Sequence, residues 1–203
     1  MKGTMRAPVL SDIHGNIDAL QAFDRLWAAR LHEFDHVIVL GDLVDYGPAP
    51  HEVIAWVRAY ATDVVRGNHD HAMATGESCS SSPTYLEAAI VTRDVLGPTL
   101  TSADLMYLRD LEVTRTIGDG PERWRLVHAT PRDPLFDYVL PTDGPAQWTD
   151  ALASGTSGAI IDGDSVQFCR VEYDTGAVIA RLRAIDLPDR VFAQLVETFR
   201  TGS

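Results

Sequence analysis

Residues 11–16 of this 203-residue chain read Ser-Asp-Ile-His-Gly-Asn and directly follow the apolar pair Val9-Leu10. Asp12 and His14 are two residues apart, so their side chains point to the same side if the strand stays extended through them. A carboxylate oxygen beside an imidazole nitrogen suits a first-row transition metal. Taken alone, the pair has an alternative interpretation, an aspartate that caps a turn beside a surface histidine.

Two further segments repeat this arrangement, in which a short apolar run ends in a glycine and polar residues. Residues 36–40 precede Gly41-Asp42, and residues 63–66 precede the tetrapeptide at 67–70, Gly-Asn-His-Asp. The carboxyl ends of parallel strands gather along one edge of an open α/β sheet. We therefore expect the polar side chains to converge there, namely Asp12, His14, Asp42, Asn68 and His69. The glycines before Asp42 and Asn68 are expected to let the backbone approach a bound ligand.

These ordered motifs resemble those of the calcineurin-like metallophosphoesterases, in particular their small bacterial phosphodiesterase branch. The matching stretches are SDIHGN at 11–16, GDLVDYGP at 41–48, GNHD at 67–70 and LVHATPRDPL at 126–135. The resemblance implies an α/β fold, a four-layer α-β-β-α sandwich of two mixed β-sheets. No shift in composition marks a second domain, so we expect residues 1–203 to form a single domain.

The resemblance also implies a two-metal site at the strand ends. The first metal would take Asp12, His14 and a bridging Asp42, and the second would share Asp42 and add Asn68 and His128. The cofactors would be two divalent or trivalent transition-metal ions, drawn from Mn, Fe, Zn, Co and Ni. Two such ions can polarise a phosphoryl oxygen and lower the pKa of a bridging water.

Further residues are candidates for contact with the substrate. By the same resemblance, His69 would protonate the leaving oxygen or hold the phosphate, and Asp70 would orient its imidazole. Asn68 is a candidate for substrate binding as well as for the second metal. Arg132 suits a phosphate oxygen through its forked guanidinium, with a salt bridge to Asp133 or Asp137 as the alternative.

The chain departs from the family pattern after His128. The family normally carries a late Gly-His-x-His loop that completes both metals, but this sequence has no histidine beyond position 128. Three interpretations compete: a deletion that leaves each metal one protein ligand short, a loop missing only from this sequence, or substitute ligands. The candidates for substitution are His71, which is otherwise a solvated loop residue, and Asp162 and Asp164, which otherwise belong to a hairpin turn.

Periodicity predicts helices over residues 17–31, 50–60, 85–96, 103–110 and 189–199, and Thr101 with Asp104 resembles a capping box. Residues 113–117 and 124–127 are expected to form one strand pair, and residues 166–173 and 177–185 another. Residues 149–153 are expected to be helical. Residues 73–84 are expected to form a flexible loop, which is either a surface linker or a substrate lid.

Composition excludes some classes of function. A net charge of -12 argues against nonspecific nucleic-acid binding, which needs clusters of Lys and Arg. No apolar run approaches the ~20 residues of a membrane helix, and nothing resembles a signal peptide, so a cytoplasmic location without membrane association is expected. The expected partner is a small phosphate-ester substrate, and a homo-oligomer is compatible with the sequence.

The leading hypothesis is a metal-dependent phosphoesterase, more specifically a phosphodiesterase, that uses a two-metal-activated water or hydroxide. The alternative is a degenerate member of the same fold with impaired metal binding, which acts as a binding or regulatory protein. Metal content together with hydrolysis of an aryl phosphodiester discriminates between the two.

Overall fold

The computed structural model describes residues 5–119, 123–139, 142–144, 146–147 and 171–201. The helix expected at residues 149–153, the hairpin turn at Asp162-Gly163, and most of the strand expected at 166–173 lie outside these ranges.

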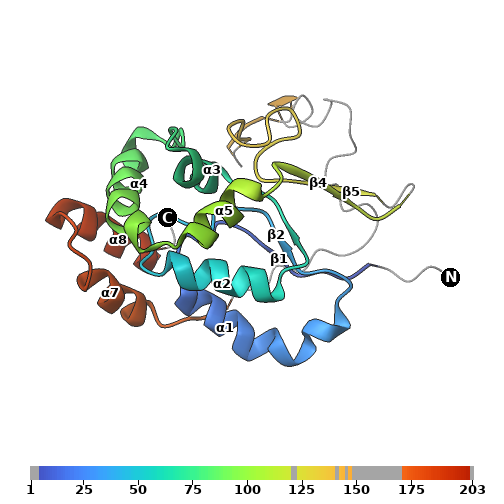
Figure 1. The fold of residues 1–203 in the computed structure, drawn as a ribbon, viewed down its shortest axis with the longest axis horizontal. Coiled ribbons are helices and arrows are strands. Elements are labelled where there is room, and N and C mark those ends of the chain that lie inside the picture. Colours follow the sequence, from blue (N-terminus) through green and yellow to red (C-terminus); the bar gives the residue numbers. More distant parts are fainter. Residues whose placement is uncertain (1–4, 120–122, 140–141, 145, 148–170, 202–203) are drawn as a thin grey trace.

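A parallel sheet of three short strands lies at the centre of the described residues (Figure 1). The strands are β1 (Val9–Leu10), β2 (Ile38–Val39) and β3 (Asp63–Val64), in the order β1-β2-β3. Leu10 pairs with Val39, which in turn pairs with Val64. Because the strands run in the same direction, the loops that follow them leave from one edge of the sheet, as the sequence predicted.

Each face of this sheet packs against a different layer. Val39 belongs to an apolar cluster with side chains from the helices α1 (Ile17–Trp27), α2 (Pro50–Tyr60) and α5 (Ser102–Asp110). Ile38, the preceding residue, packs instead with side chains of β4 (Thr114–Ile117) and β5 (Trp124–Val127), an antiparallel pair. This alternation is the two-residue period of a strand buried on both faces. The predicted α/β class with two sheets is confirmed, and the described strands form one parallel sheet and one antiparallel pair.

A second helical group lies at the other end of the molecule from β4 and β5 (Figure 1). It contains α4 (Pro83–Leu96), α7 (Thr175–Arg183) and α8 (Asp189–Thr201). Their shared core is made by five buried side chains, Ala88, Val178, Leu182, Val191 and Leu195. No helix in the described part of the chain is long and apolar enough to cross a membrane.

The prediction of a strand over residues 177–185 is wrong, because this segment forms α7. The Asp174 side chain accepts a hydrogen bond from the backbone N–H of Ala177 and so caps the helix at its N-terminus. Val178 and Leu182 are four residues apart and are both buried against α8 and α4. Their helical spacing outweighs the β propensity of the valine and isoleucine in this segment.

The other expected elements differ from the structure mainly at their ends. α2, α5 and α8 are confirmed, as is the capping box between Thr101 and Asp104. The first helix ends at Trp27 and continues as the 3₁₀ turn η1 (Ala28–Glu33), and a second such turn, η2 (Gly97–Thr99), follows α4. The loop expected at 73–84 is shorter, because α3 (Asn68–Thr75) extends into it and α4 begins at Pro83.

Asp63 joins β3 to its neighbours and gives a test of the packing between the layers. The carboxylate is bonded by the Arg115 guanidinium at 2.8 Å, the His36 ring at 2.6 Å and the Thr62 hydroxyl at 2.7 Å. Burial opposes its ionisation, yet these three hydrogen bonds lower the pKa of Asp63 below its usual value. The ionised carboxylate therefore stabilises the fold above the unfolded-state pKa of ~3.9, and this contribution is lost as pH falls through the folded-state pKa.

We expect Asp63→Asn to lower the free energy of unfolding at pH 7 by about 1–3 kcal/mol, because three hydrogen-bonding partners lose their charged acceptor. Urea unfolding of the wild type, Asp63→Asn and the exposed control Asp186→Asn measures this. The difference between Asp63→Asn and the wild type should shrink as the pH falls from about 4 through the folded-state pKa of Asp63, because the wild-type carboxylate becomes neutral first in the unfolded and then in the folded state. A difference that is unchanged at pH 3 would contradict this account.

Candidate metal centre

The five predicted metal ligands converge at the carboxyl edge of the parallel sheet. His14 Nε2 lies 3.9 Å from Asp12 Oδ1 and 3.7 Å from Asp42 Oδ2. His128 Nε2, which β5 delivers to the same edge, lies 3.4 Å from Asp42 Oδ2 and 3.0 Å from Asn68 Oδ1. Asp42 is only 2% exposed and lies between the two imidazoles. One oxygen of Asp42, Oδ2, therefore faces both imidazoles.

Hydrogen bonds to the backbone orient both imidazoles. His14 Nδ1 is 2.8 Å from the Val44 carbonyl oxygen, and His128 Nδ1 is 2.7 Å from the Leu40 carbonyl oxygen. A carbonyl accepts, so each Nδ1 carries a proton, and a neutral ring at each position would present its Nε2 lone pair to the cluster. The Asn68 amide is also fixed, because its Nδ2 donates to the Cys79 carbonyl at 2.6 Å and its Oδ1 is left facing His128.

The donor set fits a metal pair. Both Nε2 atoms face carboxylate and amide oxygens, which are acceptors, and with neutral rings such a group of acceptors is stabilised by a cation in its midst. Burial lowers the pKa of His14 to about 4, so its imidazole is neutral, as a ligand must be. Burial also raises the pKa of Asp42 to about 7. A cation beside Asp42 would offset that cost of burying the carboxylate.

The loops that carry these ligands are turns, and the expectation of an extended strand through Asp12 and His14 is wrong. Among the described residues other than glycine, six have a positive φ, and five of these lie in the two loops: Asp12, His14, Asp42, Asp45 and Tyr46. The left-handed conformation costs roughly 1 kcal/mol per residue outside glycine. Backbone hydrogen bonds between the loops offset this cost, including His14 N to Asp42 O at 2.8 Å.

In the part of the chain that the structure describes, the Asp70 carboxylate bonds to the loops and makes no hydrogen bond to the His69 ring that it was expected to orient. Its buried carboxylate accepts hydrogen bonds from the backbone N–H groups of Asp42 and Leu43, both at 2.8 Å, and of Gly67 at 3.0 Å. It therefore ties the loop after β2 to the start of α3. The residue predicted as a catalytic partner holds the backbone of the predicted bridging ligand instead.

Asp45 takes the position next to His69, and the sequence interpretation missed it. Its Oδ2 lies 2.7 Å from His69 Nδ1, and Arg93 of α4 forms an ion pair with the same buried carboxylate. Burial disfavours a charged imidazole, yet the hydrogen bond to Asp45 raises the pKa of His69 to about 10. His69 Nε2 faces Ser81 Oγ at 2.9 Å. A second aspartate three residues after Asp42 was the signal in the sequence that could have identified this partner.

Arg132 and His71 are paired with acidic side chains outside the cluster. Arg132 forms an ion pair with Asp137 at 2.6 Å, which was its alternative assignment. His71 pairs with Glu77 at 3.2 Å, so this candidate for a substitute ligand is engaged elsewhere. Asp162 and Asp164 lie outside the described residues.

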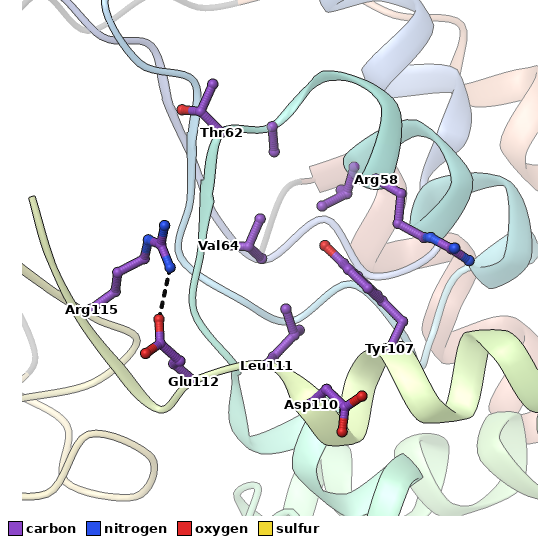
Figure 2. Close-up of a pocket in the computed structure, with 10 residues that line it drawn as sticks. Arg58, Thr62, Val64, Tyr107, Asp110, Leu111, Glu112 and Arg115 are labelled. Carbon is purple, nitrogen blue, oxygen red and sulfur yellow. Dashed lines mark hydrogen bonds and ion pairs between the residues drawn. The ribbon is translucent and has the colours of Figure 1, made fainter.

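A pocket of about 330 Å³ lies elsewhere in the molecule, between the end of α2 and the segment after α5 (Figure 2). Its lining includes Val64, Tyr107, Leu111 and Arg58, and it contains none of the predicted site residues. The residues that line this pocket therefore give no reason to connect it with the metal cluster.

Comparison with known proteins shows what the chain is similar to. A sequence model described as calcineurin-like phosphoesterase matches residues 5–154. The chain is 30% identical over 135 residues to "Uncharacterized protein MJ0912" of Methanocaldococcus jannaschii, a match that covers 66% of this chain and 53% of that protein. The chain thus spans about half the length of the curated relative it matches.

Two solved structures resemble almost the whole chain. A metallophosphoesterase from Sphaerobacter thermophilus is 26% identical with a TM-score of 0.66, and the match covers 95% of this chain and 98% of that one. The hypothetical protein PH1004 from Pyrococcus horikoshii OT3 has the same coverage, 20% identity and a TM-score of 0.75. The second likeness shows the fold alone.

The close contact between Gly67, which follows β3, and Asp42, which follows β2, allows a test of what holds the Asp42 side chain in place. A Cβ on Gly67 would lie 2.0 Å from Asp42 Oδ1. The absence of a side chain at Gly67 therefore makes room for the Asp42 carboxylate, whereas from the sequence we expected it to make room for a ligand. We expect Gly67→Ala to displace Asp42 and to weaken Mn²⁺ binding at least ~10-fold, with a loss of about 1–3 kcal/mol of stability. Calorimetric titration with Mn²⁺ and thermal unfolding measure both effects.

Gly97→Ala is the matched control, because its added Cβ would meet only the Met73 sulfur, at 3.4 Å. It should bind Mn²⁺ as the wild type does. Wild-type Mn²⁺ affinity in Gly67→Ala would show that the contact between the loops does not fix Asp42.

Proposed function

The chain belongs to the calcineurin-like phosphoesterase family, and from this premise we propose that it hydrolyses small phosphodiesters with a water activated by two metal ions. Asp12, His14 and Asp42 would hold the first ion, and Asp42, Asn68 and His128 the second. Imidazole and carboxylate ligands favour Mn, Fe, Zn, Co or Ni. When bound, the ions would act as Lewis acids and supply hydroxide at neutral pH.

One observation carries this proposal: two imidazole Nε2 atoms lie 3.7 and 3.4 Å from the same oxygen of the buried Asp42. Hydrogen bonds to Val44 and Leu40 fix both rings in this orientation. The His69 backbone N–H donates to Asp42 Oδ1 at 3.0 Å, whereas Oδ2 faces the two imidazoles, where a purely structural role would be better served by further hydrogen-bond donors. Acceptors from three separate loops that meet around one carboxylate favour a metal-binding role.

The proton for the leaving group is proposed to come from His69. Asp45 holds the His69 Nδ1–H at 2.7 Å, which leaves Nε2 to face the site. The Ser81 hydroxyl lies 2.9 Å from Nε2, so an oxygen can already occupy the position that the leaving oxygen would take. Arg93 forms an ion pair with Asp45 and so keeps that carboxylate in place.

Two further residues are proposed to hold the substrate. Asn68 would contact a phosphate oxygen beside the second metal. Arg132 would exchange its ion pair with Asp137 for an oxygen on the outer side of the phosphate.

Metal content and hydrolysis of bis(4-nitrophenyl) phosphate test the proposed function. Two metal ions per chain and metal-dependent turnover support it. At most one metal ion and no turnover would favour the alternative, a binding or regulatory protein built on the same fold.

We expect Asp42→Asn to remove more metal than any other single substitution, because only Asp42 is assigned to both ions. His14→Ala should reduce mainly one of the two. Elemental analysis of the purified variants after dialysis against Mn²⁺ measures the stoichiometry. Equal metal content in Asp42→Asn and the wild type would contradict the bridging assignment.

His69→Ala should lower turnover by ~10²–10⁴ while metal content stays at the wild-type value, as for a proton donor that is not a ligand. His71→Ala is the matched control, since it lies two residues further along α3 and pairs with Glu77. It should leave turnover within a factor of about two, well below the effect of losing a general acid. Loss of metal from His69→Ala would assign this residue to the metals instead.

A further inference from the structure

The second metal has few protein ligands in the assignment above. Asp42, Asn68 and His128 supply three donor atoms, one of them shared, whereas transition metals in proteins take four to six ligands. The sequence has no histidine after His128 that could add another imidazole. A fourth donor atom from the described residues would therefore bring the second metal to the usual minimum number of ligands.

The hydroxyl of Tyr138 lies at this position. Its oxygen is 2.7 Å from Asn68 Oδ1, which in turn is 3.0 Å from His128 Nε2. The Tyr138 ring meets the His128 ring edge to face, with centroids 6.0 Å apart. The hydroxyl thus lies beside two of the three assigned ligands.

The same hydroxyl has two acceptors and only one proton. Besides Asn68 Oδ1, the Leu135 carbonyl oxygen lies 3.0 Å away. A hydroxyl carries one hydrogen and two lone pairs, so donation to Leu135 leaves a lone pair facing the cluster. Two ligand atoms bound to one ion at ~2.1 Å and at right angles lie about 3 Å apart. The separations from Asn68 Oδ1 to Tyr138 and to His128 are both close to this value.

The segment that carries Tyr138 is braced by its own hydrogen bonds. Ala129 N donates to the Pro134 carbonyl at 3.0 Å, and the Thr130 hydroxyl donates to Asp137 at 2.5 Å. Arg132 holds the other oxygen of Asp137 at 2.6 Å. These contacts close the chain between His128 and Tyr138 into a compact loop, which returns the tyrosine to the histidine that precedes it.

We propose that Tyr138 is a further ligand of the second metal and binds through its hydroxyl oxygen while donating its proton to the Leu135 carbonyl. This inference rests on the proposed two-metal function. The site would then draw four side chains from the described loops, Asp42, Asn68, His128 and Tyr138, and would not depend on a late imidazole.

Calorimetric titration with Mn²⁺ tests the assignment in the full chain. We expect two sites in the wild type, and Tyr138→Phe should weaken the second at least ~10-fold while the first keeps its affinity. Tyr60→Phe, at the exposed end of α2, is the matched control and should behave as the wild type.

Ferric iron separates direct ligation from a hydrogen bond that only orients Asn68. A tyrosine oxygen bound to Fe³⁺ loses its proton to the buffer, and the phenolate–iron pair absorbs visible light. Wild type and Tyr60→Phe loaded with two ferric ions should show this band, and Tyr138→Phe should not. A wild type that holds two ferric ions without the band would overturn the inference.

Failure of the inference and failure of the proposed function are distinguishable. If the wild type binds two Mn²⁺ ions and Tyr138→Phe binds both equally tightly, Tyr138 is not a ligand, and the two-metal function stands. If the wild type binds no Mn²⁺, both the function and the inference fall.

Discussion

The carboxylate of Asp70 is the point on which the site depends. It is fully buried and accepts hydrogen bonds from the backbone N–H groups of Asp42, Leu43 and Gly67. Burial raises the pKa of Asp70, and these three hydrogen bonds oppose that shift by favouring the ionised form. Hydrogen bonds to an ionised carboxylate contribute roughly 1.5–3 kcal/mol each, which is more than the ~1 kcal/mol that a left-handed residue costs. Asp70 can therefore hold Asp42 in its left-handed conformation and keep its side chain between the two histidines.

From this anchor the site divides into two parts that share α3. On one side, Asp42 joins His14 and His128 in a group of acceptors suited to cations. On the other, Asp45 and Arg93 hold His69 with its Nε2 directed at the loop between α3 and α4. Asn68 and His69 are adjacent at the start of α3, so one short helix sets the distance between the proposed metal ligands and the proposed proton donor.

Much of the site could be predicted because each motif follows a short apolar strand, and parallel strands bring their carboxyl ends together whatever their exact length. The sequence could not reveal which aspartate bonds to His69, since both Asp45 and Asp70 are near it in motif order. Only the folded loops show that Asp70 is taken up by backbone donors. Tyr138 was missed because its position depends on a loop closed by Asp137, which has no periodic pattern. The segment of α7 was predicted as one strand of a pair with residues 166–173, and the packing of its helical face against α8 decided otherwise.

The most direct test of the two-metal account is a crystal structure of the chain grown with Mn²⁺, with anomalous scattering recorded near the manganese edge. The account predicts two anomalous peaks on either side of Asp42, one next to Asp12 and His14 and the other next to Asn68 and His128. A single peak would contradict it, as would a peak among Asp45, His69 and Cys79, the other buried group of potential ligands nearby.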